Sequence, residues 1–438
     1  MSTVEYRPWS NWAHTESANP QIAEPTTVDE LRNYVANAAA HGRRIKPIGA
    51  GHSFSGIGVP ADIQLRLHHL RGVVASDVEA GRVTLAAGTH LHEIPALLAP
   101  LGLAMANLGD VDRQTISGAT STGTHGTGAR FGGISTQIVG ARIVDGRGEL
   151  VAVGEQDPDL KAVALALGAL GVLADITLQC VPAFRLEAVE APGKLDDVLA
   201  GWAESVAAVD HYEFYWFPHT DCCLTKTNTR LPASTPSSGP SRIRRYIDDE
   251  LLSNKLFGVL CGIGRAVPAT VPAINQLSGR ALSARTIVDS STDVFVSSRA
   301  VRFREMEYAI PVDQIPDALR EIAAMIERRR YRVSFPVEVR AAAADDLLLS
   351  TAAGRESGYI AVHRYFKDDA ADSAAYFADV EAIMTARGGR PHWGKMHTRD
   401  ADYLRSVYPR FDDFRAVRER FDPGRVFAND YLARVLGD

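Results

Sequence analysis

The segment Ser117–Gly133 constrains the fold more than any other part of the chain, because it places six glycines among serines and threonines. Glycine allows positive φ and a close approach of the backbone to a ligand, and successive backbone N–H groups can form a nest that binds an anion. A second loop of this kind, Gly49–Ser53, follows the predicted strand Arg43–Ile48. Two such loops predict a cradle for a phosphorylated cofactor, with purely structural turns as the alternative.

The familiar nucleotide-binding motifs are absent from both loops. The spacing of Gly49, Gly51 and Gly56 does not match GxGxxG, and the chain contains no GxxxxGK[ST] sequence. This pattern disfavours a Rossmann NAD site and a P-loop. His52 lies inside the first loop, where an imidazole can act as a base, a hydrogen-bonding group or a nucleophile. By residue type alone it equally fits a loop histidine bonded to the backbone.

Composition excludes several classes of protein. The 438 residues are 46% hydrophobic and 23% charged, which predicts a globular protein of two or three domains. The net charge is −6, and the basic clusters Arg242–Arg245 and Arg328–Arg332 are short, so we expect no nucleic-acid partner. The longest apolar run, Ala162–Ala174, is shorter than the roughly 20 residues that cross a bilayer. No signal peptide is evident at the start, and four dispersed cysteines suggest a reducing compartment, so we expect a cytoplasmic protein with no membrane insertion.

Helical and strand patterns alternate along the first part of the chain, which predicts α/β or α+β layering. Thr27 and Glu30 have capping-box spacing at the start of a predicted helix over Pro25–Ala40. A second helix is predicted over Asp159–Leu167. The strand Val172–Val181 ends at Pro182, where we place the first domain boundary. Further strands are expected over Asp62–Leu67, Arg82–Ala87, Ile138–Val144, Leu150–Val153, Tyr212–Phe217, Phe303–Ile310 and Phe335–Arg340.

Several motifs, in order, resemble those of the sugar-1,4-lactone oxidases and alditol oxidases of the vanillyl-alcohol-oxidase superfamily. Residues 47–54 (PIGAGHSF) resemble the flavin-attachment loop of these enzymes, and residues 107–112 with 116–128 resemble their second FAD loop. Residues 168–172 resemble the third loop, and residues 335–340 and 392–395 resemble motifs that line the substrate side. The resemblance extends from about Trp9 to Leu432.

The resemblance implies an α+β fold. It consists of a two-subdomain FAD-binding domain over residues 1–182, an α+β cap domain with a largely antiparallel sheet over 183–390, and a C-terminal segment over 391–438 that returns to the FAD domain. It also implies that His52 is joined covalently to the 8α-methyl carbon of FAD. The other residues implied to hold FAD are Pro47, Ile48, Gly49, Ala50, Gly51, Ser53, Ser117, Gly118, Ser121, Thr122, Gly123, Thr124, His125, Gly126, Gly171, Val172, Ile176, Asn429 and Tyr431.

Glu338 and Arg340 are the main candidates for catalysis. They share one face of a predicted strand, since strand side chains repeat every second residue. Spacing alone fits a surface ion pair, whereas the resemblance places both side chains toward the flavin. Lys395 or Arg340 can then polarise a substrate hydroxyl, with His392 as a partner for Lys395. His363 lies on a strand of the same type and is a candidate proton acceptor, with a packed histidine as the alternative.

These expectations define an FAD-linked oxidoreductase that moves a hydride from a CH–OH carbon of a sugar-1,4-lactone to flavin N5, with oxygen or another acceptor reoxidising the flavin. An alditol oxidase acting on a terminal primary alcohol, as in xylitol or sorbitol, is the alternative within the superfamily. A non-catalytic sugar-binding protein and a Rossmann-type NAD(P) enzyme are the alternatives outside it. His90, His92 and Glu93, and likewise His392 and His397, form no convincing set of metal ligands, so no metal is expected.

Overall fold

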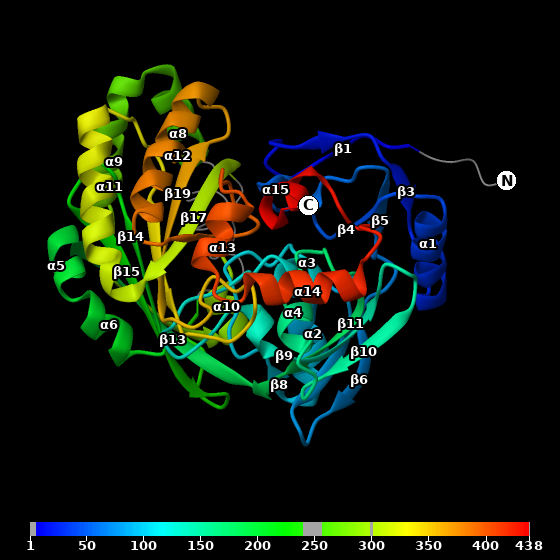
Figure 1. Cartoon of the computed structure of the whole chain (residues 1–438). Helices are drawn as coiled ribbons and strands as arrows, with labels where there is room; N and C mark the ends of the chain where they lie inside the picture. The colour runs from blue at the N-terminus through cyan, green and yellow to red at the C-terminus, as the bar shows by residue number, and fades with distance from the viewer. Residues whose placement is uncertain (1–5, 240–255, 298–300, 438) are drawn as a thin grey trace.

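The computed structural model describes residues 6–239, 256–297 and 301–437. The predicted basic cluster Arg242–Arg245 lies outside these residues. The chain forms two halves, a mainly blue-to-cyan half built from the chain up to about residue 182 and a green-to-orange half built from the residues that follow (Figure 1). Four β-sheets of the described residues belong to the first half, two of them with only two strands each, and one large sheet belongs to the second half.

The first half contains a small parallel sheet and a larger antiparallel sheet. The parallel sheet has the order β3-β5-β4, and α1 (Val28–Ala40) leads from β3 to β4. Its strands are β3 (Gln21–Ala23), β4 (Ile45–Ile48) and β5 (Ile63–Arg66). The antiparallel sheet has the order β10-β9-β11-β7-β6. Its strands are β6 (Val73–Asp77), β7 (Arg82–Ala86), β9 (Ile138–Val144), β10 (Leu150–Gly154) and β11 (Val172–Gln179).

Local sequence explains where these elements begin and end. Thr27 caps α1, because its hydroxyl accepts a hydrogen bond from the Glu30 amide. The prediction of a helix over Asp159–Leu167 was too long, since α4 covers only Leu160–Val163. Leu167 and Gly168 both adopt positive φ, which turns the chain into β11. Short elements complete this half: β1 (Trp9–Ser10), β2 (Ser17–Ala18), α2 (Ile94–Leu98), β8 (Leu103–Ala104), α3 (Ile116–Ser121) and β12 (Val181–Pro182).

The second half, which we call the cap, is built on an eight-stranded antiparallel sheet of order β16-β13-β15-β14-β18-β19-β17-β20. Its strands are β13 (Phe184–Lys194), β14 (His211–Trp216), β15 (Cys222–Pro232), β16 (Arg285–Ser290), β17 (Phe303–Pro311), β18 (Val337–Ala342), β19 (Ser357–Tyr365) and β20 (Arg390–Pro391). Its helices are α5 (Leu195–Ala200), α6 (Trp202–Ala208), α8 (Phe257–Ala266), α9 (Val271–Arg280), α10 (Ser291–Phe295), α11 (Ile315–Arg329) and α12 (Ala370–Thr385).

The alternation of side chains on the cap strands separates a core from a site. Val337 and Val339 pack with helices α5, α6, α11 and α12 in one buried apolar cluster. Glu338 and Arg340 point to the opposite face of the sheet, which is turned toward the first half. The same alternation puts Tyr308 in the core and its neighbour Glu307 on the opposite face. Thus the face of the sheet away from the helices carries the polar groups.

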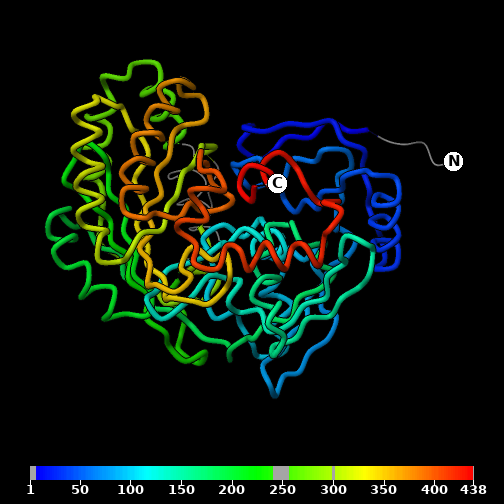
Figure 2. Tube along the Cα trace, in the orientation of Figure 1, coloured from blue at the N-terminus to red at the C-terminus, as the bar shows by residue number. Residues whose placement is uncertain are grey.

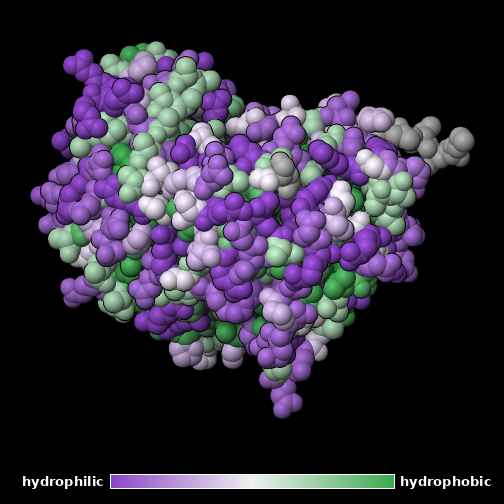
Figure 3. All heavy atoms as spheres, viewed as in Figure 1, coloured by the Kyte–Doolittle hydropathy of each residue, from purple (hydrophilic) through white to green (hydrophobic). Residues whose placement is uncertain are grey.

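The C-terminal segment returns from the cap to the first half (Figure 2). Its helices are α13 (Ala401–Val407), α14 (Phe411–Phe421) and α15 (Asp430–Leu436), and they join the apolar core of the first half. Hydrophilic residues cover most of the face of the molecule seen in Figure 3. Within the described residues, no helix has the length and apolar composition needed to cross a bilayer.

Candidate active site

The two glycine-containing loops meet around a cavity of about 600 Å³ in the first half. Part of its wall comes from the loop after β4, part from α3 and part from the turn before β11. The residues predicted to hold FAD that line this cavity are Pro47, Ile48, Gly49, Ala50, Gly51, His52, Ser53, Ser117, Gly118, Ser121, Thr122, Gly171 and Val172. The structure therefore brings together residues that are more than 100 positions apart in the sequence.

Two glycines of the first loop are required by its geometry. A Cβ on Gly49 would lie 2.3 Å from the Thr115 hydroxyl, so only glycine allows the loop to pack against the start of α3. Gly51 has φ of +68°, a conformation that other residues rarely adopt. The Thr115 hydroxyl also accepts a hydrogen bond from the Gly118 amide and caps α3. This packing keeps backbone groups of both loops at the cavity wall, as a bound diphosphate requires.

His52 lies where the first cavity meets a second one, because it lines both. Its ring stacks on Trp12, with ring centroids 5.6 Å apart. Burial, together with the positive charges of Lys395 and Arg113, lowers the pKa of His52 to about 4. The imidazole is therefore neutral near pH 7 and has an unprotonated ring nitrogen.

Seven other predicted FAD residues do not line the first cavity. Thr124 and His125 line the second cavity, whereas Gly123, Gly126, Ile176, Asn429 and Tyr431 are absent from both walls. Ile176 is fully buried in the core of the first half, where β11 directs its side chain. The Asn429 amide donates to the carbonyls of Gly56, Ile57 and Val59, and the Tyr431 hydroxyl donates to the Trp393 carbonyl. Asn429 thus holds the segment that follows His52, and Tyr431 holds the backbone at Trp393.

The second cavity, of about 530 Å³, lies between the polar face of the cap sheet and the first half. Its wall contains Glu338, Arg340 and Lys395, as predicted. It also contains His392, which was expected as the partner of Lys395, and charged groups that were not predicted to take part in catalysis, namely Asp110, Asp112, Arg113, Glu305 and Glu307. The wall therefore combines several carboxylates with a few cations around a space that opens onto His52.

Arg340 is held by three carboxylates. Its Nε donates to Glu213 at 2.9 Å, and its Nη2 contacts Glu338 and lies 3.5 Å from Asp110. Burial alone would lower the pKa of Arg340, but the charges of Glu338, Glu213 and Asp110 raise it well above its usual value. Glu338 and Arg340 are only 5% and 7% exposed, so a surface ion pair is excluded. The guanidinium is a permanent cation with fixed orientation.

Lys395 forms the second buried ion pair of the cavity. Its Nζ contacts Glu305 on β17, and not His392, which was the expected partner. Burial opposes the charge of both Lys395 and Glu305. The ammonium of Lys395 nevertheless holds the pKa of Glu305 well below its usual value. In turn, the carboxylates of Glu305 and Glu307 raise the pKa of Lys395. The ammonium remains charged and reaches the cavity wall.

His363 lies behind this pair and is not part of the cavity wall. Its Nε2 is 3.5 Å from Glu305, and its Nδ1 is 3.2 Å from the Pro336 carbonyl. The ring also packs edge-on against Phe303. The structure thus places His363 in contact with Glu305, where it can orient that carboxylate but does not face the cavity directly.

Glu305 and Glu307 could have been found from the sequence. They stand two residues apart in the strand Phe303–Pro311, the same spacing that identified Glu338 and Arg340. The aromatic and apolar residues of that strand indicate packing, which the sequence pattern alone favours over a role in catalysis. Glu213 and Asp110 had no comparable signal, because their roles depend on β14 pairing with β18 and on the path of a loop.

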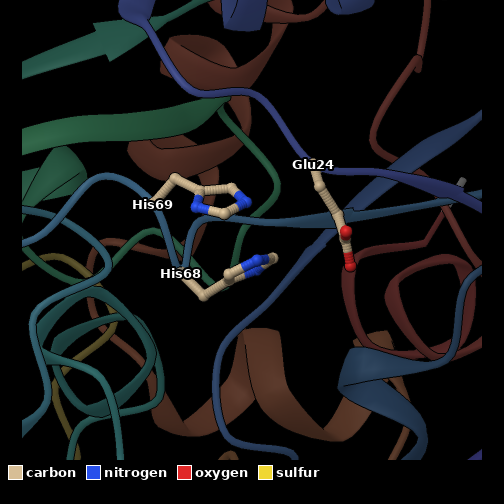
Figure 4. A group of neighbouring side chains, drawn as sticks. All are labelled: Glu24, His68 and His69. Carbon is tan, nitrogen blue, oxygen red and sulfur yellow. The ribbon is translucent and has the colours of Figure 1, made fainter.

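A group on the surface of the first half has the residue types of a metal site. Glu24, His68 and His69 gather near the mouth of the first cavity, with their side chains directed toward one another (Figure 4). Glu24 also lies 3.6 Å from the guanidinium of Arg66 and 4.0 Å from that of Arg7. Two cations beside this carboxylate disfavour a third, so we assign no metal to the group.

Comparisons with known proteins agree with this arrangement. The sequence profile of an FAD binding domain matches residues 20–154, and that of D-arabinono-1,4-lactone oxidase matches residues 176–435. An L-gulono-1,4-lactone dehydrogenase of Mycobacterium tuberculosis is 41% identical over 98% of this chain and 99% of its own length. The L-gulonolactone oxidase of Bos taurus is 32% identical over 98% of each chain.

Among solved structures, cholesterol oxidase from Brevibacterium sterolicum has the same fold, with a TM-score of 0.83 and 19% identity over 99% of this chain and 97% of that chain. The fold and the paired cavities define an FAD-dependent oxidoreductase with a cap of the vanillyl-alcohol-oxidase type. Within this class, the chain belongs to the sugar-1,4-lactone oxidase and dehydrogenase family.

Proposed function

We propose that the protein oxidises a sugar-1,4-lactone of the gulono- or arabinono-lactone type at a ring CH–OH carbon. The observation that carries the proposal is the second cavity, where Glu338, Arg340 and Lys395 surround a space that opens onto the FAD cavity at His52. Relatives that match this chain over nearly its whole length are described as gulonolactone enzymes, which supports a lactone as substrate.

We also propose that FAD is joined covalently to His52. Two features support this linkage. The imidazole lies at the junction of the two cavities, and burial keeps it neutral near pH 7, so a ring nitrogen is free to bond to the 8α-methyl carbon. A fixed cofactor would keep its reactive ring at the boundary of the substrate space.

Oxidation of a carbinol removes a hydride from carbon and a proton from oxygen, and bound FAD supplies the hydride acceptor. Glu338 accepts hydrogen bonds from substrate hydroxyls and selects the carbon that is presented for reaction. Arg340 fixes the orientation of Glu338 through their direct contact. Placement matters, because an error of about 1 Å can reduce the rate by about a hundredfold.

Lys395 polarises the hydroxyl that loses its proton. Its ammonium is held at the cavity wall by Glu305, so it stabilises negative charge that develops on the substrate oxygen. His363 acts on this step only through Glu305, as a positioning residue. The proposed chemistry therefore needs no metal.

The experiment that tests the substrate is a comparison of kcat/KM for L-gulono-1,4-lactone, D-arabinono-1,4-lactone, xylitol and sorbitol. Each is measured with a dye acceptor and, separately, with oxygen in an oxygen electrode. We expect turnover of at least one lactone to exceed that of both polyols by more than about tenfold. A higher kcat/KM for xylitol or sorbitol than for both lactones would contradict the proposal and identify a terminal primary alcohol as the substrate. The two acceptor assays show whether oxygen or another acceptor reoxidises the flavin.

A further inference from the structure

Three side chains from separate parts of the sequence form a buried cluster in the wall of the second cavity. His125 comes from the glycine-rich loop, Glu307 from β17, and His392 from the segment after β20. One nitrogen or oxygen atom of each lies within 4.8 Å of the others, and each residue is only 5% exposed. All three residues line the cavity, yet the resemblance places His125 only among the residues that hold FAD and gives it no part in the chemistry.

The hydrogen-bond partners of the two histidines differ in kind. The Nδ1 of His125 lies 2.8 Å from the Gly126 carbonyl, and its Nε2 lies 3.3 Å from a Glu307 carboxylate oxygen. Both partners are acceptors, so a neutral His125, with one N–H, would leave one acceptor facing a lone pair. An imidazolium donates to both. In contrast, Nδ1 of His392 accepts the Gly394 amide N–H at 3.1 Å, which places the single proton of His392 on Nε2.

The surroundings of His125 also favour its charged form. Its ring lies on the ring of Tyr359 in β19, with centroids 3.8 Å apart, a geometry in which a cation is attracted to the aromatic face. The charged and titratable groups packed around it are Glu307, Tyr359, His392 and Lys395. The positive charge of Lys395 opposes that of His125, but Lys395 is itself paired with Glu305. Among the described residues, His125 is therefore the group that pairs directly with the Glu307 carboxylate.

We propose that Glu307 holds His125 as an imidazolium, and that this fixed positive charge faces the catalytic cavity. Its role in catalysis rests on the proposed function. Oxidation transfers a hydride, and with it negative charge, to the cofactor side of the cavity while the hydroxyl proton leaves. A preorganised cation in a buried site stabilises such charge without reorganisation. His125 would thus act together with Arg340 and Lys395, from the glycine-rich loop of the first half.

The same three residue types can bind a transition metal, but the hydrogen bonds disfavour it. A metal on Nε2 of His392 would require that nitrogen to lose its proton while Nδ1 still accepts the Gly394 N–H. The ring would then be an anionic imidazolate, which is unfavourable in a buried cluster that already contains a carboxylate. A second proton on the His125 ring lets it donate to both the Gly126 carbonyl and Glu307, and it leaves His392 neutral.

Nitrogen NMR of the holoenzyme labelled with ¹⁵N-histidine tests the proposal directly. The His125 signals are assigned by their loss in His125→Gln. We expect both ring nitrogens of His125 to be protonated at about pH 7.5, and His392 to carry one proton on Nε2. In Glu307→Gln, His125 should become singly protonated at the same pH. A neutral His125 in the wild type, or a charged His125 in Glu307→Gln, would overturn the proposal, and neither result depends on which substrate is oxidised.

The second readout is the midpoint potential of the bound flavin. Without the fixed cation, His125→Gln and Glu307→Gln should both shift it to a more negative value. His41→Gln, the same substitution at an exposed histidine on the far end of α1, should leave it unchanged. Equal potentials in all four proteins would contradict an electrostatic role. Zn²⁺ added to the wild type should not bind stoichiometrically. Stoichiometric binding that is lost in His125→Gln would show that the cluster holds a metal and would overturn the proposed imidazolium.

Discussion

Glu305 and Glu307 lie two residues apart on the same face of β17, and each is neutralised by a different partner. Glu305 contacts Lys395, and Glu307 lies 3.3 Å from His125. Burial alone would raise the pKa of a carboxyl group, yet the charge of His125 lowers the pKa of Glu307 to about 2, and Lys395 lowers that of Glu305. The strand thus carries two carboxylates that stay ionised and fix two cations at the cavity wall.

Replacing the Glu338–Arg340 pair should separate catalysis from cofactor binding. Glu338→Gln and Arg340→Ala should retain FAD, because neither residue lines the first cavity, but kcat should fall by about a hundredfold or more. Flavin absorbance per chain and steady-state turnover measure the two effects. Arg304→Ala, on strand β17 of the same sheet and outside the cavity wall, is the matched control. Wild-type turnover in both site variants would remove the pair from the mechanism.

Loss of the Lys395 ammonium should affect both rate and stability. In Lys395→Met, His363 is the one charged or titratable partner that Glu305 keeps within the described part of the chain. Breaking a buried ion pair costs about 3–5 kcal/mol of unfolding free energy. The kcat should fall by about a hundredfold, because the hydroxyl is no longer polarised. Chemical denaturation and turnover provide the measurements. Lys161→Met, at a half-exposed lysine, should change neither by more than a small amount. Unchanged turnover in Lys395→Met would exclude Lys395 from the chemistry.

Mild acid should destabilise the fold. Burial lowers the pKa of His211 to about 4 and that of His392 and His397 to about 3, against about 6.5 in the unfolded chain. Between pH 6.5 and these values the unfolded chain binds protons that the folded chain does not, so stability decreases as the pH falls. In that window each histidine lowers the free energy of unfolding by up to about 1.4 kcal/mol for each pH unit of acidification. Urea unfolding at pH 7.5 and 5.5 tests this, and equal free energies of unfolding would show that the histidines are not held neutral.

The C-terminal helix should be required for the geometry around His52. Asn429 caps α15 through its side-chain oxygen, while its amide donates to three carbonyls of the segment after His52. Asn429→Ala should lower the free energy of unfolding by about 2 kcal/mol and reduce flavin incorporation. Asn37→Ala, at an exposed position of α1, is the control. Full stability and full flavin content in Asn429→Ala would show that this contact is dispensable.

The proposed covalent bond between His52 and FAD can be tested by replacing His52. His52→Ala should still bind FAD, because most of the first cavity wall is unchanged, but the flavin should be released by acid or denaturant. Acid precipitation, followed by measurement of flavin fluorescence in the pellet, distinguishes noncovalently bound flavin from covalently bound flavin. His90→Ala, at another histidine of the same cavity wall, should keep the flavin in the pellet. Acid-released flavin from wild-type protein would rule out the covalent bond.

Much of the site follows from local sequence. The loop before His52 is recognisable because Gly49 and Gly51 have geometric reasons to be glycine, and the positions of Glu338 and Arg340 follow from strand alternation. The strand Phe303–Ile310 was also predicted, and it extends by one residue, to Pro311. The positive φ of Gly51 and the alternation along the two strands are local properties, although the contact that requires Gly49 is with the distant Thr115.

Partners that come from distant segments could not be predicted in this way. Lys395 pairs with Glu305 and not with its neighbour His392, because β20 adds to the edge of β17 and sets where the following loop reaches the sheet. His363 was expected to face the substrate, but the Glu305 side chain lies between it and the cavity. Asn429 and Tyr431 were expected at the cofactor, whereas α15 uses them to bind backbone carbonyls. These outcomes depend on sheet order and helix docking.

Anaerobic mixing of the oxidised holoenzyme with L-gulono-1,4-lactone, followed by the visible absorbance of the flavin, tests the central claim most directly. The account predicts rapid loss of the flavin absorbance in the wild type, and loss at least about a hundredfold slower in Glu338→Gln with the same flavin content. A wild-type spectrum that stays oxidised with gulono- and arabinono-lactones, or a Glu338→Gln variant that is reduced as fast as the wild type, would contradict it.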